Sequence, residues 1–148
     1  MIYLDANIFI YAYFKARRGK VLSDKIKWCK EQAKEIIKKI NAEEGSYCIS
    51  LIQVSEVVNL LKGVMSWEDL RKLILGILSN PAIEIVEISK LIYINAVDKI
   101  SDYFMDSNDI SAYLIMKSKK ISKIYSFDRH FSNFKDIVCL PRIPDKFK

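Results

Sequence analysis

Four acidic residues of this 148-residue sequence stand where a folded chain could bring them together. Asp5 is the one charged residue in the apolar run of residues 1–11, and Asp128 directly follows the strand-forming run of residues 124–127. Two further acids lie in segments with helical patterns. Carboxylates gathered in a small volume repel one another unless cations lie between them. The sequence therefore predicts a metal site whose ligands are Asp5, Glu56, Asp109 and Asp128.

The available ligand types indicate which metal such a site would hold. His130 is the only histidine, and the cysteines are odd in number, far apart and without a CxxC pair, which does not suit zinc. Cys29, Cys48 and Cys139 lie in apolar patterns and are expected to be buried, reduced thiols. Oxygen ligands alone suit Mg²⁺ or Mn²⁺, which keep several waters and also contact phosphate oxygens.

A basic segment suggests the substrate. The net charge is +6, and residues 15–39 alone hold ten Lys or Arg against three acids. Such a segment attracts polyanions, nucleic acid first, although a solvated helix face explains the same charges equally well. The candidate nucleic-acid contacts are Lys30, Lys34 and Lys38. Because a bound cation activates water and neutralises charge at phosphorus, the combination points to phosphodiester hydrolysis.

Two short polar residues are placed to support the acids. Asn7 is two residues past Asp5, and Ser126 is two residues before Asp128. Both can hydrogen-bond a carboxylate or a metal-bound water. Turn formation is the ordinary alternative for Asn and Ser.

The two acids in helical segments have simpler explanations that stay open. Asp109 can be a helix N-cap, and Asp106 competes with it both for that place and for the place of third acid. Glu56 can be an exposed helix acid. The metal site rests on the four positions together.

Apolar patterns predict an α/β fold with a parallel sheet of four to five strands and helices on both faces. A single domain is expected over residues 1–148, located in the cytosol, since there is no signal peptide pattern and no apolar stretch long enough to span a membrane. Expected strands cover residues 1–5, 47–49, 83–88, 123–127 and 136–140. Expected helices cover residues 7–14, 25–40, 51–62, 67–79, 90–104 and 110–120. In the fifth helix the residues expected to face inward are Tyr93, Ala96, Val97, Ile100 and Phe104.

With these motifs in view, the sequence resembles the PIN-domain nucleases, in particular the VapC-type toxins of toxin–antitoxin pairs. The resemblance lies in residues 4–11, 50–56, 108–110 and 124–131. It implies a metal-dependent ribonuclease with Asp5, Glu56, Asp109 and Asp128 as its acids and Asn7 and Ser126 in support. It also implies a homodimer and an antitoxin partner. Tyr113 and Met116 depart from the family, which often has alanines there.

Rival functions were compared on the same residues. Phosphatases that form an aspartyl-phosphate need a second Asp where Asn7 stands, and an amide cannot act as the general acid. The four glycines do not form a nucleotide-binding loop. The alternative that stays open is a non-catalytic nucleic-acid-binding module in which the acids are remnants.

Overall fold

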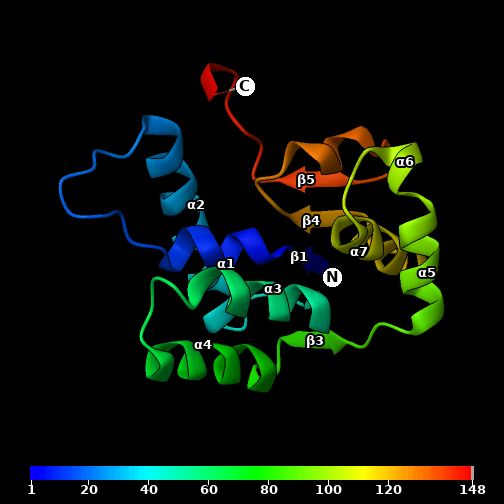
Figure 1. Ribbon diagram of the computed structural model, residues 1–148, viewed down its shortest axis with the longest axis horizontal. Coiled ribbons are helices and arrows are strands. Elements are labelled where there is room, and N and C mark those ends of the chain that lie inside the picture. Colours follow the sequence, from blue (N-terminus) through cyan, green and yellow to red (C-terminus); the bar gives the residue numbers. More distant parts are fainter. Residues whose placement is uncertain (148) are drawn as a thin grey trace.

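The computed structural model describes residues 1–147 and contains a five-stranded sheet with helices on both faces (Figure 1). The strand order is β3-β2-β1-β4-β5, and all neighbours pair in parallel. This confirms the predicted α/β architecture, with β3 and β5 at the two edges of the sheet. The strands are β1 (Ile2–Leu4), β2 (Tyr47–Ser50), β3 (Ile83–Val86), β4 (Lys123–Tyr125) and β5 (Val138–Leu140).

Seven α-helices and two short 3₁₀ helices connect and cover the strands within residues 1–147. Ser50, Ser66 and Ser89 each accept a hydrogen bond from the backbone N–H three residues on, so three helices begin where the sequence predicted. The elements are α1 (Ala6–Tyr13), α2 (Asp24–Asn41), α3 (Leu51–Leu61), α4 (Trp67–Ser79), α5 (Lys90–Asp98), α6 (Ile100–Tyr103), α7 (Ser107–Ser118), η1 (Arg129–Asn133) and η2 (Asp145–Phe147).

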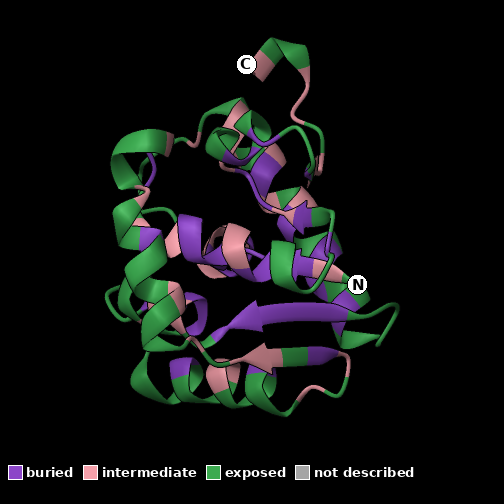
Figure 2. Cartoon of the chain, turned by 90° about the vertical axis from the view of Figure 1, so that its right-hand side faces the viewer, coloured by how far each residue is buried: buried purple, intermediate pink, exposed green. Residues whose placement is uncertain are grey.

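The alternation of side chains along the strands divides the core between the two faces of the sheet. Leu4 and Ile49 join one cluster, which the buried sides of α1, α2, α3 and α4 complete. Tyr3 and Cys48 point to the other face and pack with α5, α7 and η1. β2 is buried along its whole length, whereas β3 becomes more exposed beyond its first residue (Figure 2). Cys29 and Cys48 are buried free thiols, and Cys139 is a partly buried one.

The prediction of one long helix over residues 90–104 was wrong. Lys99 has φ −96° and ψ 0°, and its N–H donates to the carbonyl of Ala96 three residues back, so α5 ends there and α6 begins a new turn. Of the five residues expected to face inward, only Ala96 is buried, and Phe104 is 85% exposed with a left-handed φ of 52°. Only one narrow side of this segment packs against the sheet, so its other apolar residues face solvent.

The sheet is shorter than predicted at its carboxyl edge. β4 ends at Tyr125 rather than at residue 127, although the N–H of Ser126 still donates to the carbonyl of Leu140 at 2.8 Å. The chain therefore leaves the sheet at the point where its polar residues begin. No helix among residues 1–147 is long and apolar enough to cross a membrane.

Candidate metal centre

Asp5 leaves the end of β1 and occupies the N-cap position of α1, but its side chain does not cap that helix. The N–H of Ala6 instead donates to Oε1 of Gln53 on α3 at 2.8 Å. The Asp5 carboxylate, 5% exposed, accepts a hydrogen bond from Oγ of Ser126 at 2.5 Å. Gln53 thus accepts the first N–H of α1, and the buried Asp5 carboxylate bonds Ser126 instead.

Gln53 is a supporting residue that the sequence did not reveal. Its place three residues after Ser50 predicted a reciprocal capping box, in which Gln53 would bond the backbone of Ser50. In the structure its side chain crosses to the backbone after Asp5, and it is fully buried. The sequence spacing could not show this, because the contact depends on how α3 packs against the start of α1.

Asn7 and Ser126 join the two ends of the sequence. Oγ of Ser126 accepts from Nδ2 of Asn7 at 3.2 Å and from the N–H of Asp128 at 2.9 Å, while it donates to Asp5. Oδ1 of Asn7 accepts from the N–H of Phe127 at 3.2 Å. The segment after β4 is thereby fastened to the start of α1, and Asp128 is carried to the same edge of the sheet as Asp5.

Asp128 is the N-cap of η1, and one of its two carboxylate oxygens is already bonded within the chain. Its Oδ1 accepts from the N–H of His130 at 2.8 Å and lies 2.9 Å from Nδ1 of the same residue. Among residues 1–147 no group donates a hydrogen bond to Oδ2, so that oxygen is open to a further ligand. The exposed ring of His130 covers the outer side of the carboxylate.

The start of α7 shows how the surroundings of Asp106 and Asp109 differ. Oδ1 of Asp106 accepts from the N–H groups of Asn108 and Asp109, at 2.8 and 3.0 Å, so Asp106 is the N-cap. Asp109 lies in the first turn and is not used for capping. Nδ2 of Asn108 donates to Oε2 of Glu56 at 3.4 Å, which links α3 to the start of α7.

The electrostatics indicate that the acids act on one another. Burial raises the pKa of Asp5 to about 7, and the charges of Glu56 and Asp128 add to the rise, against the hydrogen bond from Ser126. Burial also raises the pKa of Asp109 to about 8, with contributions from the charges of Asp5, Asp106, Asp128 and Glu56. The pKa of Glu56 is raised as well, by burial first. The fold thus gathers negative side chains from four separate segments.

The donor set fits a hard divalent cation, in an open rather than an enclosed site. All four acids offer oxygen, and their mutual repulsion is what a cation relieves. Within residues 1–147, however, no three His, Cys, Asp or Glu side chains are arranged so that they could hold a metal ion among them. Mg²⁺ often uses only one or two carboxylates together with waters and substrate phosphates, and such a site needs no closed cage.

The three lysines predicted to contact nucleic acid differ in their surroundings. The Lys30 ammonium donates to the carbonyls of Tyr11, at 3.1 Å, and Phe14, and lies 4.2 Å from the centre of the Phe14 ring. It therefore holds the C-terminal end of α1. Lys38 is exposed and pairs with Glu35 at 2.6 Å, and Lys34 is exposed on the same side of α2. Lys30 has a structural role that the sequence pattern did not reveal.

Solved structures with a similar fold were found in three bacteria. Mycobacterium tuberculosis VapC20, described as a toxin that cleaves the sarcin–ricin loop, superposes with a TM-score of 0.69 at 15% identity, covering 90% of this chain and 94% of that one. A toxin–antitoxin complex from Klebsiella pneumoniae gives 0.61 at 19% identity, covering 93% and 96%. VapBC2 from Rickettsia felis, bound to a promoter DNA fragment, gives 0.59 at 16% identity, covering 94% and 97%.

At these identities the solved structures establish the fold alone. A search of curated protein sequences returned no match to the chain. The family model of the PIN domain, in contrast, matches residues 2–137. These residues include β1 to β4 and all four acids, but not β5. The chain belongs to the PIN domain family.

Proposed function

We propose that this protein is a metal-dependent endoribonuclease that hydrolyses RNA phosphodiesters with Mg²⁺ or Mn²⁺. The observation that carries the proposal is the electrostatic coupling of Asp5, Glu56, Asp109 and Asp128, which come from four segments far apart in the sequence. Membership of the PIN domain family supports it, as does the description of the similar M. tuberculosis toxin.

The residues of the candidate metal centre would have different roles in such a reaction. A divalent cation, when bound, would stabilise charge on the phosphate and lower the pKa of an attacking water. The oxygens of Asp5 and Asp128, with Glu56 and Asp109 beside them, would bind the cation. Ser126 and Asn7 orient Asp5 through the hydrogen bonds described above.

The biological role that fits best is the toxin of a toxin–antitoxin pair. The structural relatives include a toxin–antitoxin complex and the VapBC2 assembly. We therefore infer a protein antitoxin as partner, a homodimer, and a cytoplasmic site of action. On α4, Leu70 and Ile77 are buried in the core, whereas Leu75 and Leu78 are exposed and available to a second copy. Light scattering of the purified chain would measure the oligomeric state.

The direct test is cleavage of single-stranded RNA by the purified chain. Cleavage is expected with Mg²⁺ or Mn²⁺ and is expected to stop when EDTA is added. Cleavage that continues in EDTA would contradict metal dependence, because EDTA removes the divalent cation that the oxygen ligands would bind.

One observation favours the alternative of a non-catalytic nucleic-acid-binding module. Within residues 1–147 the acids do not form a closed set of three metal ligands. If the module is correct, the chain will bind RNA equally well with and without metal and will not cleave it. Asp5→Asn will then leave binding unchanged.

Ser126→Ala is predicted to lower the cleavage rate about tenfold, because Asp5 loses the hydrogen bond that favours its charged form and Asp128 loses a backbone contact. Without that bond the pKa of Asp5 rises further, so the pH at which the rate is half-maximal should also move up. Rate against pH measures both effects. Ser101→Ala, an exposed change on α6, is the control, and equal rates for the two variants would contradict the role of Ser126.

Reversing the charge of Lys34 and Lys38 together is predicted to weaken RNA binding about tenfold at low salt and to make the affinity less dependent on salt. Both side chains are exposed, so the fold should persist. Fluorescence anisotropy in EDTA measures the dissociation constant at several salt concentrations. Lys72→Glu on α4 is the matched control. An unchanged salt dependence would mean that this side of α2 is only a solvated face.

A further inference from the structure

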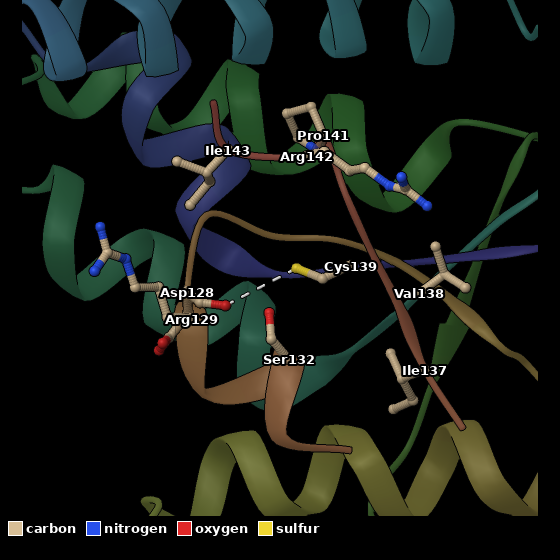
Figure 3. Close-up of a pocket in the computed structure, with 9 residues that line it drawn as sticks. All are labelled: Asp128, Arg129, Ser132, Ile137, Val138, Cys139, Pro141, Arg142 and Ile143. Carbon is tan, nitrogen blue, oxygen red and sulfur yellow. Dashed lines mark hydrogen bonds between the residues drawn. The ribbon is translucent and has the colours of Figure 1, made fainter. Parts of the chain in front are cut away.

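A pocket of about 550 Å³ lies beside Asp128, between the turn η1, the strand β5 and the segment that follows it (Figure 3). Its volume falls within the range of small-molecule sites in proteins. None of its lining residues except Asp128 belongs to the candidate metal centre. The pocket is lined by Asp128, Arg129, Ser132, Ile137, Val138, Cys139, Pro141, Arg142 and Ile143.

The lining has an apolar middle and basic sides. In Figure 3 the thiol of Cys139 and the hydroxyl of Ser132 point toward the middle, near the side chain of Ile143. The guanidinium groups of Arg129 and Arg142 extend outward on opposite sides. Asp128 is the single acid against these two arginines. An apolar centre with flanking guanidinium groups complements a ligand that is flat and apolar in the middle and anionic at its ends.

The pocket shares a wall with the candidate metal centre. The Cys139 thiol donates to the carbonyl of Ser126 at 3.3 Å, and contacts the carbonyl of Asp128 at 3.9 Å. Ser126 is the residue that hydrogen-bonds Asp5. A ligand in the pocket would therefore be separated from the acids only by the short segment of residues 126–128.

The outer wall is fastened to the rest of the fold. Nη2 of Arg129 donates to the carbonyl of Phe147 at 2.5 Å, and the Phe147 ring lies 6.0 Å from that of Trp28 on α2. The segment with Arg142 and Ile143 is thus held between β5 and this anchor. The pocket is a built feature of the fold.

We propose that this pocket binds one nucleotide of single-stranded RNA, adjacent to the phosphodiester that is cleaved. The base would occupy the apolar middle, where Ser132 can hydrogen-bond its edge, and the phosphates on either side would pair with Arg129 and Arg142. Guanidinium groups pair with phosphates bidentately and stack on bases. This inference rests on the proposed function, since it names where that site would hold its substrate. The two arginines favour RNA over an acidic or apolar protein segment, because a strand has a phosphate at every step.

Photo-crosslinking tests the contact without requiring cleavage. A short single-stranded RNA in which uridines are replaced by 4-thiouridine is irradiated with the protein in EDTA, and the digested protein is analysed by mass spectrometry. The expected result is RNA attached to the tryptic peptides of residues 130–135 or 136–142, which contain Ser132 and the β5 wall of the pocket. Crosslinks confined to other peptides would overturn the proposal and leave the pocket to a protein partner.

Two substitutions then test the energetics. Arg142→Ala is expected to weaken binding of the same RNA about fivefold and to lower its salt dependence. Ser132→Trp, at an exposed position of η1 whose hydroxyl points toward the middle of the pocket (Figure 3), is expected to fill the pocket and weaken binding similarly without unfolding the chain. Arg71→Ala, an exposed arginine on α4, is the control and should leave binding unchanged.

The failure of this inference can be separated from the failure of the proposed function. If Arg142→Ala and Ser132→Trp bind and cleave RNA as the unaltered chain does, the pocket is not a nucleotide site, while metal-dependent cleavage still stands. If the unaltered chain never cleaves RNA but both variants bind it more weakly, the pocket is a nucleotide site and the ribonuclease proposal is wrong.

Discussion

Asp5→Asn is expected to lower RNA cleavage by roughly 100-fold or more, while the fold stays intact. The amide keeps the shape of the carboxylate, and its oxygen can still accept the hydrogen bond from Ser126. What the substitution removes is a negative charge at the end of β1, where a cation would bind. Cleavage under saturating Mn²⁺ and the melting temperature are measured on the same preparation.

Asp136→Asn is the matched control for this loss. Asp136 is an acid of the same type that pairs with Lys117 at 2.8 Å on the surface, away from the candidate metal centre. An exposed pair of this kind contributes little to stability, so neither cleavage nor melting should change much. If Asp5→Asn cleaves RNA normally, or if it unfolds the chain, then Asp5 is a structural residue and the proposed reaction loses its central ligand.

The metal-free protein is expected to become less stable as the pH rises from 5 to 8.5. Burial raises the pKa of Asp5 to about 7 and that of Asp109 to about 8, whereas the unfolded chain releases these protons near pH 4. Between those values the folded state holds more protons than the unfolded state. The free energy of unfolding therefore falls with rising pH, and each pKa unit corresponds to about 1.4 kcal/mol.

The resulting change should be large enough to measure by thermal unfolding. The melting temperature is predicted to fall by roughly 10 °C across this range in EDTA. Added Mn²⁺ or Mg²⁺ should restore it, and by more at pH 8.5 than at pH 5.5, because protons and cations compete for the same oxygens.

Asp5→Asn provides the control for the pH effect, because an amide does not titrate. Its melting temperature should depend less on pH than that of the unaltered chain, and divalent cations should raise it less. A melting temperature that rises with pH in EDTA would contradict the raised pKa values of the two acids. It would mean that a basic side chain already neutralises them.

The arrangement of the sheet could be predicted from the sequence because it follows from local rules. Apolar runs marked the strands, serine N-caps marked the helix starts, and parallel strands bring their carboxyl ends to one edge. Asp5 and Asp128 follow two neighbouring strands, β1 and β4, so their approach could be inferred. The choice between Asp106 and Asp109 could not, because both can cap a helix.

What the sequence could not provide depends on tertiary contacts. Lys30 had the pattern of a surface lysine, but α2 packs against α1 so that its ammonium reaches two backbone carbonyls. Gln53 had the spacing of a capping residue and bonds Ala6 instead. The stripe from Tyr93 to Phe104 had helical spacing, yet the sheet offers that segment only a narrow contact. The pocket beside Asp128 forms between β5 and a segment with no regular pattern.

A crystal of the protein soaked in Mn²⁺, with data collected at a wavelength where manganese scatters anomalously, tests the central claim most directly. The account predicts one strong anomalous peak at the carboxyl edge of the sheet, in contact with Asp5 and with oxygens of Asp109 or Asp128. The same soak of Asp5→Asn should give a weak peak or none. A peak elsewhere on the molecule, or one that survives Asp5→Asn at full strength, would contradict it.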